Sequence, residues 1–106
     1  MVMTAYNVVR FRAKPGREKE LLASFEARDA ALADRLKKNG LRKITVIKTG
    51  DRSYCLIGEW DSMDGIVKSR PDLVARLDLQ RGMLEDLGGN LGVSDPVSGE
   101  AVVELT

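Results

Sequence analysis

The sequence predicts an α+β fold with the element order βαββαβ, in which helices cover one face of a four-stranded antiparallel sheet. The hydrophobic pattern changes twice along the chain from strand-like alternation to helical spacing. Turn signals rich in glycine, proline and asparagine separate these stretches. A length of 106 residues with no internal repeat or linker fits a single domain spanning 1–106.

The first part of the chain predicts a strand followed by a helix. Residues 3–13 are rich in β-forming side chains and stop at a Lys-Pro-Gly turn signal, 14–16. From Arg17 to Lys38, apolar side chains recur at helical spacing, which predicts one long helix. Gly40, in an Asn-Gly pair, supplies the stop signal.

Two strands are expected next, over residues 41–49 and 53–60. The three residues 50–52 between them include a glycine and predict a short hairpin loop. A hairpin makes the two strands antiparallel neighbours.

The remainder predicts a divided helix, a loop and a last strand. Ser62 is a plausible N-cap for a short helix, and Pro71 is expected to interrupt it and begin a second helix over roughly 72–87. Residues 88–100 are glycine-rich and predict a loop that either covers a pocket mouth or partner subunit, or simply returns to the sheet. Residues 101–105 predict the last strand. The complete order is the split-βαβ, or ferredoxin-like, pattern.

Both faces of the predicted sheet are apolar. Side chains alternate along a strand, which assigns Asn7 and Trp60 to the helix-covered face. The opposite face carries Tyr6, Val8, Cys55 and Ile57. Antiparallel sheets with a solvated face normally alternate between apolar and polar residues. A second copy of the chain is therefore the expected cover, giving a homodimer, although a long loop could cover the same face.

The composition excludes several classes of function. The chain has no histidine, which removes the commonest general base and the commonest metal or haem ligand, and it has no nucleotide, metal or hydrolase motif. We therefore expect no cofactor and no metal. A net charge of +1 favours neither nucleic acid nor membrane as a partner. The single cysteine and the absence of a leader pattern or long apolar run favour a cytoplasmic protein.

Five residues are candidates for a site. Asn7 is a poor strand former and could donate a hydrogen bond in a pocket, or its amide could simply satisfy a neighbouring backbone group. Trp60, at a strand end, could form a pocket wall and donate its indole N–H, or belong to the core. Tyr54 and Phe11 share their face and are candidate substrate contacts, with core packing as the alternative. Arg70 borders the expected helix break and is a candidate anion contact.

These residues together resemble the antibiotic biosynthesis monooxygenase family of the dimeric α/β-barrel superfamily. The matching segments are the opening strand and turn, 8–18, the strand end 56–62, and the tail 91–99. The resemblance covers nearly the whole chain. It implies that two ferredoxin-like subunits pack their sheets face to face into a barrel, with an apolar pocket between each sheet and its helices.

The resemblance also implies an activity. Family enzymes oxygenate electron-rich aromatics or quinols with dioxygen and without metal, flavin or haem. Asn7 and Trp60 match positions that an asparagine and a tryptophan occupy in some active members, including haem-degrading relatives. Those relatives also need a haem-ligating histidine on the later helix, which this chain lacks.

Three hypotheses follow. The first is a cofactor-independent monooxygenase acting on an aromatic phenol or quinol. The second is a non-catalytic homodimer that binds a small aromatic or hydrophobic molecule. The third, an RNA-binding domain with the same βαββαβ order, is disfavoured because residues 53–60 lack the basic and aromatic pattern of such domains.

Overall fold

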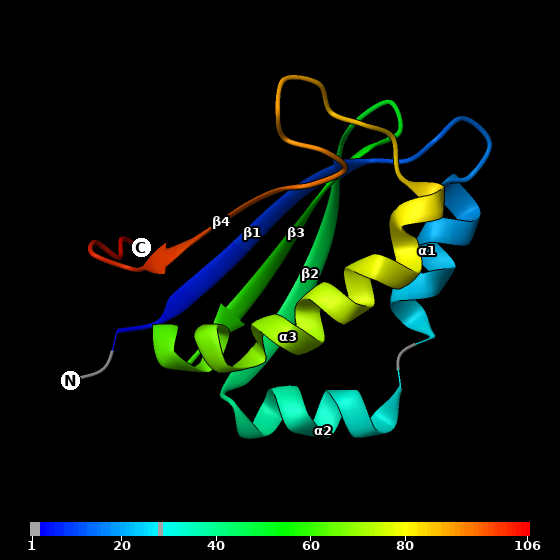
Figure 1. The fold of residues 1–106 in the computed structure, drawn as a ribbon. Coiled ribbons are helices and arrows are strands. Elements are labelled where there is room, and N and C mark those ends of the chain that lie inside the picture. The colour runs from blue at the N-terminus through cyan, green and yellow to red at the C-terminus, as the bar shows by residue number, and fades with distance from the viewer. Residues whose placement is uncertain (1–2, 28) are drawn as a thin grey trace.

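The structure is a computed structural model that describes residues 3–27 and 29–106. Three helices lie on one side of a four-stranded sheet, as Figure 1 shows. The elements in chain order are β1 (Ala5–Arg12), α1 (Glu18–Glu26), α2 (Ala30–Lys38), β2 (Leu41–Gly50), β3 (Ser53–Trp60), α3 (Met63–Gln80), the 3₁₀ turn η1 (Arg81–Met83) and β4 (Asp95–Glu100).

The sheet has the strand order β2-β3-β1-β4, and every neighbouring pair is antiparallel. This confirms the predicted α+β, ferredoxin-like arrangement. The register pairs Asn7 with Gly58 and Ala5 with Trp60, so the helix-covered face is the one assigned from the alternation. Within one chain the sheet is open, with β2 and β4 at its edges.

The prediction of one long helix over 17–38 is wrong, because the chain forms two helices there. α1 ends at Glu26, and Ala27 leaves the helical conformation with a ψ angle of 50°. Asp29 is extended, and its carboxylate accepts a hydrogen bond from the backbone N–H of Ala31 at 3.0 Å. This is an N-cap, and it starts α2 as a new helix. The continuous apolar spacing concealed the cap.

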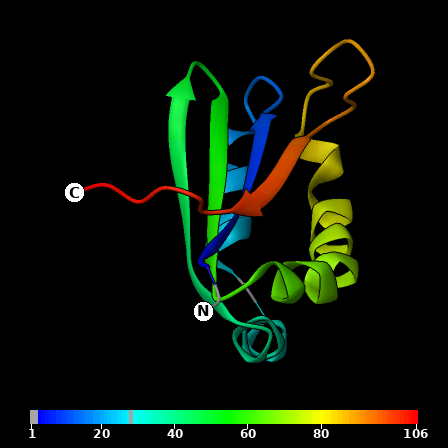
Figure 2. The same ribbon diagram turned by 90° about the vertical axis from the view of Figure 1, so that its left-hand side faces the viewer.

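The prediction of two separate helical pieces around Pro71 is also wrong. α3 runs through Pro71 without a break, from its N-cap Ser62 to Gln80. Proline has no N–H to donate to the carbonyl four residues earlier, and its ring clashes with that carbonyl, so that a proline inside a helix produces a kink when the helix continues. Figure 2 shows the resulting change of direction between the green first half of α3 and its yellow second half.

The last strand lies earlier than the sequence predicted. β4 is formed by Asp95–Glu100, while residues 101–105 form no strand and leave Val102 and Val103 exposed. Pro96 lies within β4 opposite Val9, which an edge strand tolerates because only one of its sides is paired. The prediction failed because this strand contains proline and glycine in place of typical β-forming residues.

The loop before β4 is shorter than expected and is packed. The N–H of Leu87 donates to the carbonyl of Gly92 at 2.8 Å, and Gly88 and Gly92 have positive φ angles that only glycine adopts without strain. Val93 packs against the core. The segment returns to the sheet, and Ser94 at its end also lines the space between the sheet and the helices. That the loop covers a pocket mouth or contacts a partner subunit stays a prediction.

The core consists of two separate clusters. One lies at the end of the sheet where α1 and η1 pack, and consists of Phe11, Ala13, Leu21, Tyr54, Met83 and Leu84. The other lies where α2 and the start of α3 pack, and consists of Ala5, Leu36, Leu41, Trp60 and Ile66. The middle of the helix-covered face of the sheet lies between the two clusters. The side chains of this middle region, such as Val9, Val46 and Leu56, are only half-buried.

Gly65 allows a close approach between α3 and the loop that follows α2. A Cβ at this position would lie 1.9 Å from the carbonyl oxygen of Asn39, so the first turn of α3 sits directly on the connection between α2 and β2. We expect Gly65→Ala to lower the free energy of unfolding by about 2 kcal/mol or more in urea denaturation, because the backbone must shift.

The matched control is Gly82→Ala, since a Cβ at Gly82 meets no atom within 4 Å. This variant should be neutral or slightly more stable, because alanine reduces the freedom of the unfolded chain. Equal stability of the two variants would contradict the packing described for α3.

Candidate functional site

A cavity of about 1010 Å³ lies between the sheet and the helices. Val9, Val46 and Leu56 line it from the sheet, and Leu73 and Leu77 line it from α3. All five side chains are half-buried, because the two core clusters hold the helices at the ends of the sheet and leave its middle uncovered. Large apolar cavities with a few polar groups are typical of small-molecule sites.

Asn7 and Trp60 meet at one end of this cavity. Trp60 is fully buried, and its indole N–H donates a hydrogen bond to Oδ1 of Asn7 at 2.6 Å. Asn7 is half-buried and lines the cavity from β1. The two candidate residues therefore lie together, but the indole N–H is directed at Asn7 and not at a ligand. Trp60 therefore orients the Asn7 side chain and does not itself offer a donor to the cavity.

This hydrogen bond fixes the orientation of the Asn7 amide. An indole can only donate, so the atom facing it must be the amide oxygen. The NH₂ group of Asn7 makes no hydrogen bond with the described residues. No buried polar side-chain atom of the described residues lacks a partner, so this NH₂ group reaches accessible space. Asn7 thus offers its NH₂ group as a donor to a molecule in the cavity.

Gly58 makes the Asn7–Trp60 contact possible. It pairs with Asn7 across β1 and β3, two residues before Trp60 on the same face. A Cβ at Gly58 would lie 2.0 Å from Oδ1 of Asn7 and 2.9 Å from Nε1 of Trp60. Any side chain at this position would occupy the space of the hydrogen bond. From the sequence alone, Gly58 was predicted only as a residue of the strand 53–60, and its role in this contact was not predicted.

Of the other three candidates, two line this cavity and one does not. Phe11 lines the cavity but is 5% exposed, with its ring centroid 5.5 Å from that of Phe25. Arg70 is exposed at the cavity rim and makes no ion pair with the described residues. Tyr54 is buried in the core cluster near α1, at the end of the sheet away from Trp60, and does not line this cavity.

The hydroxyl group of Tyr54 is hydrogen-bonded to the carboxylate of Glu18. The hydroxyl donates to Oε2 of Glu18, which also accepts from Nζ of Lys48 at 3.2 Å. The hydrogen bond to this carboxylate, with burial adding to it, raises the pKa of Tyr54 to about 12. The same hydrogen bond lowers the pKa of Glu18. Tyr54 therefore stays protonated near neutral pH and cannot act as a base.

Gln80 is a site residue that the sequence analysis missed. It is 6% exposed, is the last residue of α3 and lines the cavity. Its Nε2 donates to Oγ of Ser24 in α1 at 2.9 Å. The signal was present in the sequence, because Gln80 continues the apolar spacing of Leu73 and Leu77 around the helix. A polar residue on such a stripe calls for a reason.

The described ranges contain no group of three or more cysteine, aspartate and glutamate side chains that could hold a metal ion. Within the same ranges, no helix is long and apolar enough to cross a membrane.

We expect Gly58→Ala to break the Asn7–Trp60 hydrogen bond. The chain has one tryptophan, so one indole N–H signal is expected in a ¹H–¹⁵N spectrum. That signal should exchange slowly with solvent in the wild type, and should shift and exchange faster in the variant. Gly99→Ala, where a Cβ meets no atom within 4 Å, should leave it unchanged. An unaltered indole signal in Gly58→Ala would contradict the proposed role of Gly58.

Comparison with known proteins places the architecture among solved structures. No protein-family model matches the chain, and no curated protein sequence matches it. A dimeric ferredoxin-like protein from an uncultured marine organism is 17% identical, with a TM-score of 0.73 and coverage of 98% of this chain and 92% of that one. SnoaB, a cofactor-independent oxygenase from Streptomyces nogalater, is 19% identical, with a TM-score of 0.69 and coverage of 98% of both chains.

A proposed antibiotic biosynthesis monooxygenase from Bordetella bronchiseptica is 15% identical, with a TM-score of 0.69 and coverage of 95% of this chain and 99% of that one. At these identities the similarity is one of fold. It extends over nearly the whole chain, as the resemblance seen in the sequence did. The chain therefore has the ferredoxin-like fold of the antibiotic biosynthesis monooxygenases.

Proposed function

We propose that this protein is a small cofactor-independent monooxygenase that oxidises an aromatic phenol or quinol with dioxygen. The observation that carries the proposal is the Asn7 amide, which Trp60 holds with its NH₂ group free at one end of an apolar cavity. The fold shared with SnoaB, an oxygenase that needs no cofactor, supports the same function.

The reaction can proceed without a cofactor because the substrate supplies the electrons. In the oxidation of a phenol to a quinone, one oxygen atom of dioxygen becomes the new carbonyl and the other leaves as water. A ring bound between the apolar walls would displace water from the cavity, which would strengthen the hydrogen bonds made there. Asn7 donates a hydrogen bond to the oxygen on which negative charge develops.

The protein's own residues favour an ionised phenol. There is no histidine to act as a base, and Tyr54 keeps its proton. Arg70 stands at the rim without an ion-pair partner among the described residues. Its positive charge would attract a phenolate and favour the ionised form of a bound phenol. The proton is then lost to solvent before the substrate is enclosed.

The proposed assembly is a homodimer formed through the outer sheet face. Tyr6, Val8 and Ile57 are half-buried on this face, and Val97 is 63% exposed beside them on β4. An apolar sheet face of this kind usually marks an interface. A chain with the same fold is dimeric. Packing two such faces together would give the α/β barrel that one open sheet cannot form.

A second candidate function is the binding of a small aromatic or hydrophobic molecule without turnover. It is favoured by the way two expected donors are used inside the protein. The indole of Trp60 bonds to Asn7, and the phenol of Tyr54 bonds to Glu18. An apolar cavity with a few polar groups is sufficient for binding.

The oxygenase proposal predicts that Asn7→Ala lowers turnover by on the order of 100-fold, the usual effect of removing one pre-organised donor. Oxygen consumption with 1-naphthol and 1,5-naphthalenediol measures this. Ser98→Ala is the matched control, because Ser98 lies opposite Asn7 on β4 and also lines the cavity. It should keep nearly full activity.

Undiminished turnover in Asn7→Ala would refute the role of Asn7. Binding of these phenols without oxygen consumption would favour the second candidate function over the first.

The assembly proposal predicts a dimer in light scattering at micromolar concentration, and a monomer for Ile57→Lys, because a buried unpaired charge opposes the interface. Leu79→Lys is the control. Leu79 is 83% exposed on α3, away from the sheet, so this variant should remain a dimer. A monomeric wild type would rule out the barrel.

A further inference from the structure

We propose that Gln80 binds the ligand and determines specificity, because its carbonyl oxygen accepts a hydrogen bond from a ligand hydroxyl at the end of the cavity away from Asn7. The inference rests on the proposed ligand-binding role of the cavity. It deepens that proposal by naming the substrate class, a flat aromatic with an oxygen acceptor at one end and a hydroxyl group at the other.

The orientation of the Gln80 amide follows from Ser24. The Ser24 hydroxyl donates its single proton to the carbonyl oxygen of Leu21 at 2.6 Å. Its oxygen can then only accept from Gln80, so the NH₂ group of Gln80 faces Ser24 at 2.9 Å. The carbonyl oxygen of the Gln80 side chain is left for another partner.

That carbonyl oxygen has no hydrogen-bond donor among the described residues. It is not sealed in the protein either, because no buried polar side-chain atom of the described residues lacks a partner. Gln80 is 6% exposed and lines the cavity, and we therefore assign the open space that this oxygen reaches to the cavity. An acceptor in so enclosed a place favours a ligand that brings a donor.

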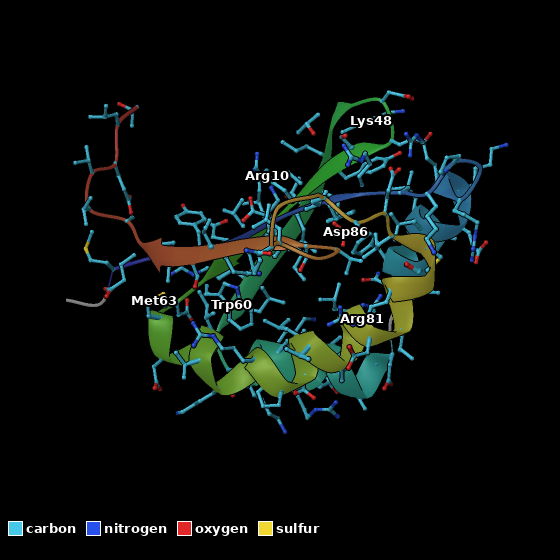
Figure 3. The ribbon with its side chains drawn as sticks, turned by 45° about the horizontal axis from the view of Figure 1, so that its top comes forward. Arg10, Lys48, Trp60, Met63, Arg81 and Asp86 are labelled. Carbon is cyan, nitrogen blue, oxygen red and sulfur yellow. The ribbon has the colours of Figure 1, made fainter. Side chains whose placement is uncertain are left out.

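Gln80 and Asn7 lie toward opposite ends of the cavity. Asn7 bonds to Trp60, which belongs to the cluster with Ala5 and Ile66. Gln80 bonds to Ser24, within the turn of α1 that begins at Leu21 of the other cluster. In Figure 3, Trp60 lies near Met63 at the start of α3, and Arg81, the residue after Gln80, lies at its far end.

The two amides make the two ends of the cavity chemically different. Asn7 offers an NH₂ donor and Gln80 offers a carbonyl acceptor, with apolar side chains between them. A fused aromatic with a carbonyl or phenolate oxygen facing Asn7 and a hydroxyl facing Gln80 satisfies both amides. An aromatic that lacks the distal hydroxyl leaves the Gln80 oxygen without a partner, which lowers its affinity.

Matched ligand pairs test this inference by calorimetric titration. The pairs are 6-hydroxy-1-tetralone against 1-tetralone, and 2-hydroxyanthraquinone against anthraquinone. We expect the wild type to bind the hydroxylated member of at least one pair about tenfold more tightly, the effect of about one net hydrogen bond. Gln80→Met should abolish this preference, because a thioether is a poor acceptor for the ligand hydroxyl and leaves no amide oxygen unpaired beside the unsubstituted member.

Ser24→Ala provides a second test that leaves Gln80 in place. Without the Ser24 oxygen, the Gln80 amide is free to rotate, so the preference should fall to between the wild-type and Gln80→Met values. Leu79→Ala, an exposed neighbour on α3, should retain the full preference. Circular dichroism verifies that each variant is folded.

A wild type with no hydroxyl preference in either pair, or a preference that persists in both Gln80→Met and Ser24→Ala, would overturn the inference. The result is independent of turnover. A preference that depends on Gln80 in a protein that consumes no oxygen leaves the inference intact and removes the oxygenase function. Oxygen consumption without a Gln80-dependent hydroxyl preference would support the oxygenase function and overturn the inference.

Discussion

The hydrogen bond between Trp60 and Asn7 is the contact on which the proposed site depends. It joins the two central strands on their helix-covered face, and it selects which end of the Asn7 amide is available. Gly58 leaves the space in which the bond forms, and burial of the indole makes breaking it unfavourable, since a buried donor would lose its partner. One bond therefore contributes to folding and, in the proposed site, to ligand recognition.

The first three strands were the most predictable part of the chain. Alternation along 5–12 and 53–60 assigned the correct faces, because strand geometry allows only two. Helix boundaries were harder to predict. Asp29 caps α2 within an unbroken apolar pattern, and Pro71 bends α3 without ending it. Both outcomes depend on packing across the fold, which local sequence does not contain.

The candidate site was only partly predictable for a similar reason. The sequence indicated that Asn7 and Trp60 share a face, but not that the indole faces the amide. Tyr54 shares that face too, yet lies at the other end, where Glu18 of α1 reaches its hydroxyl. Gln80 and Ser24 come from different helices, and only the tertiary fold brings them together. Pairings between distant segments are what a single sequence conceals most.

The division of the core into two clusters has a consequence for stability. A central cavity of about 1010 Å³ means that this chain gains less from apolar burial than its composition would allow. A ligand that fills the space completes the core, and its binding energy adds to the free energy of unfolding by mass action. If the proposed ligand fills this space, the folded lifetime of the protein is coupled to the supply of that ligand, and the empty form is the one more readily unfolded and degraded.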